Sequence, residues 1–126
     1  MSSDSKGRKK KRGIGFRYAW HGLVRVISSE RNFRIHLSVA SIVCIAGAVF
    51  SISALEWAVV VGIIALVMTL EMVNSAIERI LDHLAPERHP AVGEVKDIAA
   101  GAVLVASAGS IVIGLIIFLP KLIPLL

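Results

Sequence analysis

Three long apolar runs take up most of this chain and restrict the folds open to it. They cover residues 33–52, 57–69 and 98–119, and the second continues through residues 70–83 without a turn signal. A helix of about 20 residues spans the ~30 Å hydrocarbon core of a bilayer. A chain of 126 residues that is 56% hydrophobic is too small to cover so much apolar surface in water. The sequence therefore predicts an all-α integral membrane domain with three transmembrane helices.

The basic residues add an orientation to this prediction. Of the 14 Lys and Arg residues, ten precede Ile35, three lie between the second and third apolar runs, and only Lys121 follows the third run. With three spans the first two groups fall on one side, and the positive-inside rule makes that side cytoplasmic. The net charge of +5 is thus expected to reflect topology and contact with anionic lipid. No basic module with interleaved aromatic residues supports nucleic-acid binding.

The chain is expected to run from a basic tail through a surface helix to the three spans. The tail is predicted to be disordered. The next segment has an apolar stripe opposite a basic face, which suits an amphipathic helix lying in the membrane interface. A helix packed on a soluble partner is the alternative for that segment. The predicted ranges are 1–13 for the tail, 14–28 for the surface helix, 33–52, 54–84 and 94–119 for the spans, and 14–126 for the whole membrane domain.

Local signals support these boundaries. Ser53 and Glu56 fit a capping box that would start the second span on the outer side. The two prolines in residues 85–93 predict a loop before the third span. Within that span small residues recur every four positions, a spacing that predicts close packing of helices within or between subunits. These small residues are Ala102, Ala106, Ser110 and Gly114.

A polar stripe interrupts the second span at its cytoplasmic end. At ~100° per residue, three carboxylates, an amide and a hydroxyl fall within roughly 100° on one helix face. Acids are costly inside a bilayer, so the stripe predicts a functional site. The alternative is a helix end that surfaces into water with its acids solvated. The stripe consists of Glu71, Asn74, Ser75, Glu78 and Asp82.

The chemistry has to come from this stripe, because the sequence contains no P-loop, dinucleotide glycine motif, protein-kinase motif or zinc-like spacing. Acids and a lysine are expected at one depth: Glu30, Glu71, Glu78, Lys96 and Asp97. Paired carboxylates beside a basic group suit Mg²⁺ with a polyphosphate. A deeper carboxylate suits a general base acting on a lipid alcohol. From the residues alone, phosphoryl transfer and ion binding both remain open.

Four sequence blocks resemble those of a known family. Residues 71–78, Glu-Met-Val-Asn-Ser-Ala-Ile-Glu, followed by Asp82, resemble the signature of the prokaryotic diacylglycerol kinases, a family that includes the undecaprenol kinases of Gram-positive bacteria. The block that begins at Lys96-Asp97 resembles the second conserved block of that family, and residues 17–23 and 30–36 resemble its amino-terminal blocks. The resemblance covers about residues 13–121.

The resemblance implies a homotrimeric kinase of the bacterial plasma (inner) membrane that uses ATP and Mg²⁺ at cytoplasmic active sites shared between subunits. Glu71 would be the catalytic base, Glu30 and Glu78 would hold the metal, and Asn74 would orient groups beside the base. The nucleotide would be contacted by Lys96 and Asp97, and its site would be lined by Tyr18, Glu87, Arg88 and His89. The family's basic nucleotide contact near the start falls at about Lys11, in a low-complexity segment that matches poorly.

The lipid substrate and two non-kinase functions stay open. The loop at residues 86–90 and the tail at 116–122 look more like the undecaprenol kinases, which favours undecaprenol as the substrate and undecaprenyl phosphate as the product. Diacylglycerol, giving phosphatidic acid, is the alternative. An oligomeric ion- or proton-translocating subunit with Glu71 as carrier is a further alternative, and so is a non-catalytic assembly factor. The second acid, Glu78, and the Lys96-Asp97 pair argue against the carrier.

Overall fold

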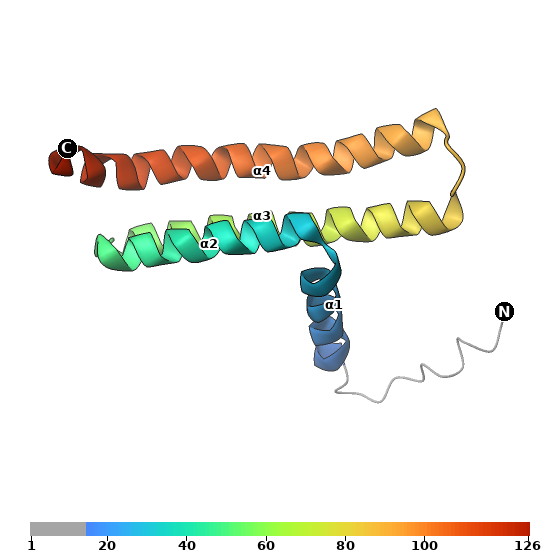
Figure 1. Cartoon of the computed structure of the whole chain (residues 1–126), viewed down its shortest axis with the longest axis horizontal. Helices are drawn as coiled ribbons and strands as arrows, with labels where there is room; N and C mark the ends of the chain where they lie inside the picture. The colour runs from blue at the N-terminus through green and yellow to red at the C-terminus, as the bar shows by residue number, and fades with distance from the viewer. Residues whose placement is uncertain (1–14) are drawn as a thin grey trace.

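The computed structural model describes residues 15–126, and every regular element within that range is helical. Four α-helices follow one another in the chain, and Figure 1 labels them. They are α1 (Gly15–Ser29), α2 (Arg31–Val49), α3 (Ala54–Leu84) and α4 (Pro90–Leu122), and α4 is followed by a short 3₁₀ turn, η2 (Ile123–Leu125). The expected basic tail, including Lys11, lies outside the described residues.

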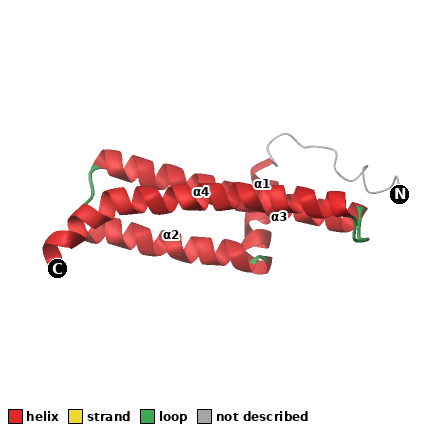
Figure 2. Cartoon of the chain, turned by 90° about the horizontal axis from the view of Figure 1, so that it is seen from above, coloured by secondary structure: helices red, strands yellow, loops and turns green. Residues whose placement is uncertain are grey.

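Three of the helices in the described range, α2, α3 and α4, are long and apolar enough to cross a membrane, as the sequence predicts. They run side by side, with short loops at the two ends of the bundle, whereas α1 stands across their direction (Figures 1 and 2). The 31 residues of α3 give a length of about 46 Å at ~1.5 Å per residue. Since the hydrocarbon core is ~30 Å thick, α3 is long enough to extend beyond it.

The predicted capping box at the start of α3 is confirmed. The backbone N–H of Glu56 donates to Ser53 Oγ at 3.1 Å, and the backbone N–H of Ser53 donates to Glu56 Oε1 at 3.0 Å. Just before it, Gly47 lets α2 approach α3, because a Cβ there would lie 2.8 Å from Cη2 of the Trp57 ring. The turn between α2 and α3 is therefore closely packed before it, at Gly47, and capped after it, at Ser53.

The third spanning helix is longer than residues 94–119 at both ends. It begins at Pro90, where His89 Nδ1 accepts a hydrogen bond from the backbone N–H of Ala91 at 3.1 Å. Proline is favoured in the first helical turn because its missing N–H would have no partner there, so Pro90 starts the helix. At the other end the helix continues through Pro120 to Leu122. The helix α3 has the expected bounds, and α1 and α2 differ from the expected ranges by one to three residues at their ends.

Ion pairs tie the antiparallel helices α3 and α4 together at both ends. Lys96 Nζ lies 2.5 Å from Asp82 Oδ1 at one end, and Lys121 Nζ lies 3.5 Å from Glu56 Oε1 at the other. A buried apolar cluster is formed by Ile52, Val60 and Ile117. The two pairs fix which residues of α3 and α4 lie at the same depth.

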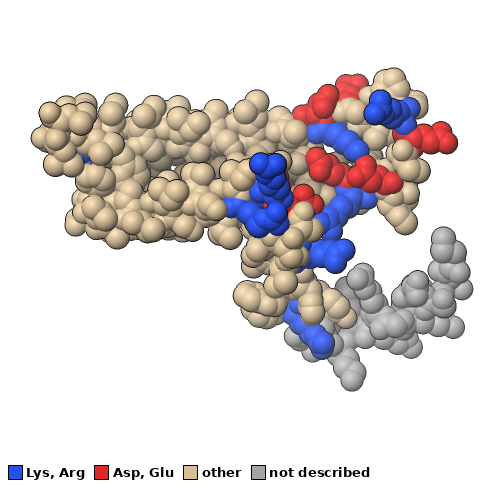
Figure 3. All heavy atoms as spheres, in the orientation of Figure 1, with Lys and Arg blue, Asp and Glu red and all other residues tan. Residues whose placement is uncertain are grey.

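The charged side chains lie mostly at one end of the bundle. On the face seen in Figure 3 they gather where α1 and the loop between α3 and α4 lie, and most of the remaining length is uncharged. Many large apolar side chains on α2, α3 and α4 are exposed in the single chain. Such a large exposed apolar surface requires lipid or further protein to cover it.

Candidate active site

The polar stripe of α3 is partly buried inside the helix bundle. Glu71 is 3% exposed, Asn74 7% and Ser75 2%, and they are the buried polar side chains among residues 15–126. Glu78 is half-buried and Asp82 is exposed. The expectation of a solvated helix end therefore fits Asp82 but not Glu71. Burying a carboxylate costs free energy. A buried carboxylate therefore indicates a function that a neutral side chain could not serve.

Two of the buried groups in the stripe lack hydrogen-bond partners. Asn74 Oδ1 and Ser75 Oγ are both shielded from solvent and have no partner in the described part of the chain. An unsatisfied buried polar atom costs free energy, so it usually marks a place where water, an ion or a ligand binds. Both atoms lie within about one helical turn of Glu71, which makes the buried part of the stripe a candidate ligand site.

Three acidic side chains converge on this region. Glu30 and Glu78 lie close enough to Glu71 to act on it electrostatically. On the other side, His36 Nε2 of α2 lies 3.8 Å from Glu71 Oε2. The three carboxylates come from the junction of α1 with α2 and from α3, so the packing of α2 against α3 brings them together.

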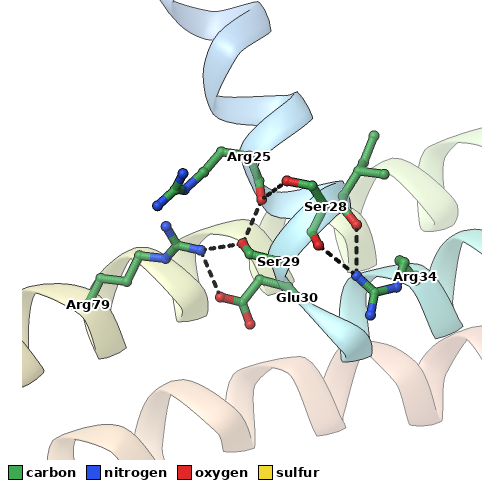
Figure 4. Close-up of polar contacts among 7 residues, drawn as sticks. Arg25, Ser28, Ser29, Glu30, Arg34 and Arg79 are labelled. Atoms are coloured by element: carbon green, nitrogen blue, oxygen red, sulfur yellow. Dashed lines mark hydrogen bonds and ion pairs between the residues drawn. The ribbon is translucent and has the colours of Figure 1, made fainter.

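Glu30 is held at this junction by a network of polar contacts (Figure 4). Arg79 Nη2 donates to Glu30 Oε1 at 3.0 Å and to Ser29 Oγ at 2.6 Å. Arg34 Nη1 donates to the carbonyl oxygens of Ile27 and Ser28, both at 3.1 Å, and so caps the end of α1. Arg79 therefore pairs with Glu30 at this junction.

Glu30 and Glu78 are chemically suited to hold a magnesium ion. Mg²⁺ is usually bound by one or two carboxylates together with substrate phosphates rather than by an all-protein cage. Among residues 15–126 no group of three or more His, Cys, Asp or Glu side chains could hold a metal by itself. Two carboxylates that lack a third protein ligand fit a metal carried in with a phosphate.

A cavity of about 500 Å³ lies beside the loop between α3 and α4. Glu87, Arg88 and His89 line it together with Asp82 and Lys96. Its volume is within the range of small-molecule sites, ~300–1,000 Å³, and its lining carries two basic and two acidic side chains, with Lys96 paired to Asp82. Four of the predicted nucleotide contacts therefore share one cavity. Tyr18 on α1 and Asp97 on α4 are exposed and do not line it.

The sequence reasoning missed three contacts: His36 with Glu71, Arg79 with Glu30, and Asp82 with Lys96. Each contact joins two segments of the chain, and its members are 14 to 49 residues apart. The helical period within one segment shows which face a residue occupies but not which residue faces it. A covarying pair in related sequences is the signal that could have revealed them.

A family model and several known proteins match most of this chain. Residues 17–118 match the family model described as prokaryotic diacylglycerol kinase. The undecaprenol kinase of Bacillus subtilis (strain 168) is 40% identical over 107 residues, which cover 85% of this chain and 87% of that protein. The diacylglycerol kinase of Synechocystis is 35% identical over 90% of this chain and 65% of its own length. That of Escherichia coli (strain K12) is 30% identical over 71% of this chain and 73% of its own length. The resemblance seen in the sequence is confirmed, and the chain belongs to the prokaryotic diacylglycerol kinase family, a family of lipid kinases.

Proposed function

We propose that this protein transfers the γ-phosphate of ATP to the hydroxyl of a membrane lipid alcohol, with Glu71 as the general base. The observation that carries the proposal is the buried carboxylate of Glu71 with two further carboxylates near it. A carboxylate at this depth can meet a lipid hydroxyl that never leaves the bilayer. The family assignment favours this reaction over the ion- or proton-translocating alternative.

Glu71 accepts the proton of the lipid hydroxyl in this reaction. The hydroxyl oxygen then forms a bond to the γ-phosphorus, the bond from that phosphorus to the bridging oxygen breaks, and the electron pair leaves with ADP. A phosphoryl transfer of this kind depends on positioning and charge neutralisation more than on covalent chemistry. Asn74, whose buried Oδ1 has no partner in the described part of the chain, lies one turn from Glu71 and orients groups beside the base.

The nucleotide and its metal lie on the charged side of Glu71. Mg²⁺ held by Glu30 and Glu78 would neutralise charge that develops on the phosphate oxygens. Lys96 and Arg88 in the loop cavity supply positive charge for the nucleotide, and Glu87 and His89 line the same cavity. Tyr18 and Asp97 complete the proposed contacts. Glu30 Oε1 is paired with Arg79 in this structure, so metal binding uses the other oxygen or displaces the arginine.

The charged end of the bundle is proposed to face the cytoplasm of a bacterial cell, with α1 lying in the interface of the plasma membrane. The basic residues at this end support the orientation through the positive-inside rule. Phe16 and Trp20 stack on each other at the exposed surface of α1, with ring centroids 6.5 Å apart, and are suited to the interface.

A homotrimer with shared active sites would cover surface that one chain leaves open. A Cβ added at Gly101 or Gly109 of α4 would meet nothing within 4 Å, so in a single chain these positions leave room for another helix. Small residues on a membrane helix favour close contact between helices. This open face of α4 supports an oligomer, and the number three rests on the family resemblance.

Undecaprenol is the favoured lipid, since the similar protein of Bacillus subtilis is an undecaprenol kinase and matches over most of both chains. Diacylglycerol is the second candidate, because other relatives are diacylglycerol kinases. The test uses the full-length protein in bilayers, with Mg·ATP and either lipid alcohol, and measures ADP and the phosphorylated lipid. We expect undecaprenyl phosphate to form faster than phosphatidic acid. ADP release that no lipid alcohol stimulates would reject the kinase proposal, and faster phosphorylation of diacylglycerol would reverse the order of the lipids.

A further inference from the structure

An apolar cavity of about 220 Å³ lies between α2, α3 and α4 and ends at His36. Aliphatic and aromatic side chains make up nearly all of its lining, and His36 and Ser110 are the polar exceptions. Val67 and Met68 belong to the lining, and Glu71 lies three and four residues further along α3, which places it on the same face one turn beyond. His36 thus lies where the apolar cavity meets the buried carboxylate.

The same depth holds a polar group from each of the three long helices. His36 of α2 contacts Glu71 of α3, and the register set by the two ion pairs between α3 and α4 places Ser107 level with Glu71. Ser107 Oγ is shielded from solvent and has no hydrogen-bond partner among the described residues. This polar layer closes the apolar cavity on the side of the charged end.

His36 is the basic side chain paired with Glu71 within residues 15–126. Its basic neighbours have other partners: Arg79 binds Glu30, Arg34 caps α1, and Lys96 pairs with Asp82. The other charged groups that act on Glu71, Glu30 and Glu78, are acidic. In the described part of the chain, His36 is therefore the basic side chain that can hold this carboxylate as a hydrogen-bond donor.

We propose that His36 is a positioning residue, which holds Glu71 Oε2 through Nε2 and turns the other carboxylate oxygen toward the end of the apolar cavity. The proposal rests on the kinase function above and adds a residue to its machinery. The hydrocarbon next to the lipid hydroxyl occupies the cavity, and the hydroxyl lies at the polar layer. A histidine suits this role better than a lysine or arginine, because a neutral imidazole donates one hydrogen bond without adding a fixed charge.

The 3.8 Å separation is longer than a hydrogen bond. Hydrogen bonds between catalytic groups are often long before substrate binds and shorten in the complex. A base oriented by a third group is the general arrangement around an activated hydroxyl. The buried Glu71 side chain, 4% exposed, has little water to orient it, so its direction depends on a protein partner such as His36, whose side chain is 26% exposed.

Two substitutions of different reach test the proposal. In His36→Gln the amide nitrogen lies close to the position of Nε2, whereas the shorter amide of His36→Asn cannot reach Glu71. His83→Asn is the matched control, since His83 is exposed at the end of α3. Steady-state rates of lipid phosphorylation are measured with Mg·ATP for each full-length variant in bilayers. A second set of measurements repeats His36→Asn in a Glu71→Gln background.

We expect His36→Asn to lower kcat about 10- to 100-fold, the rate equivalent of one hydrogen bond to a charged group. The KM values for ATP and lipid should change less than about threefold, because the proposed role of His36 is to orient Glu71 and not to bind substrate. His36→Gln should stay within about threefold of wild type, and His83→Asn should match it. In the Glu71→Gln background His36→Asn should have almost no further effect, since residues that act as a unit are not additive.

Other outcomes overturn the proposal in distinguishable ways. An unchanged kcat in His36→Asn, or an equal loss in His36→Gln and His36→Asn, shows that reach to Glu71 does not matter. A full further loss in the Glu71→Gln background shows that His36 acts independently. A raised KM for lipid at constant kcat makes His36 a substrate contact instead. If wild type itself shows no phosphorylation that depends on a lipid alcohol, the kinase function fails, and the role of His36 fails with it.

Discussion

At the scale of single residues, Glu71 is the side chain whose chemistry the structure explains best. Its carboxylate is buried, unlike the exposed acids Glu87, Glu94 and Asp97 of the same chain. A carboxylate that served only solubility would lie with them in water. Its burial beside an apolar cavity supports the proposed role of Glu71 as the proton acceptor for a lipid hydroxyl.

Replacing Glu71 by glutamine keeps the size of the side chain and removes its ability to accept a proton. We expect Glu71→Gln to lower the rate of lipid phosphorylation at least about 100-fold, since a positioned base contributes ~10²–10⁴-fold. ATP affinity should change less than roughly tenfold. Glu94→Gln on the exposed start of α4 is the control and should have wild-type activity. Near-normal turnover would show that Glu71 is not the base, and loss of the oligomer would make it a structural acid.

Glu78 is proposed to bind the metal rather than to take part in the proton transfer. We expect Glu78→Gln to abolish most activity and to raise the Mg²⁺ concentration needed for half of what remains, because one of two carboxylate ligands is lost. The measurement is a Mg²⁺ titration of lipid phosphorylation at fixed ATP, with Glu94→Gln titrated in parallel. Normal turnover at the normal Mg²⁺ requirement would remove Glu78 from the site.

At the scale of helices, the close approach of α2 to α3 depends on Gly47. A Cβ at that position would lie 2.8 and 2.9 Å from two atoms of the Trp57 ring. We expect Gly47→Ala to lower the free energy of unfolding by about 1–3 kcal/mol, the usual cost of overpacking. Thermal unfolding in detergent measures it. Gly62→Ala is the control, because a Cβ there meets nothing within 4 Å. A matching midpoint for both variants would mean that the Trp57 ring moves aside freely.

The helices themselves could be predicted from sequence, but the contacts between them could not. The capping box at Ser53 and the polar face at Glu71 follow from spacing within one segment, and both are present. The start of α4 at Pro90 was missed because proline was treated only as a helix breaker. The contact of His36 with Glu71 depends on how α2 and α3 pack, which no periodicity within either helix determines.

At the scale of the whole molecule, the separation of charged and apolar surface determines how the chain sits in a membrane. Glu30, Glu78 and the loop cavity all lie at the charged end, where α1 and the loop between α3 and α4 lie on the face seen in Figure 3. The far end carries Glu56 paired with Lys121. An active site that uses a water-soluble nucleotide has to open on the side where ATP is found. The proposed function therefore requires the charged end to be cytoplasmic.

Cysteine labelling in sealed vesicles tests this orientation. The labelling uses a chain in which Cys44 is replaced by alanine. Single cysteines are then placed at two exposed positions, Ala54 in the first turn of α3 and Ala91 in the first turn of α4. In right-side-out vesicles we expect a membrane-impermeant maleimide to label Ala54→Cys at once and Ala91→Cys only after the membrane is opened. Inverted vesicles should give the opposite pattern, because α3 crosses the membrane between the two labelled positions. If Ala91→Cys is the outer residue, the nucleotide site faces away from cytoplasmic ATP, and both the topology and the proposed kinase reaction are rejected.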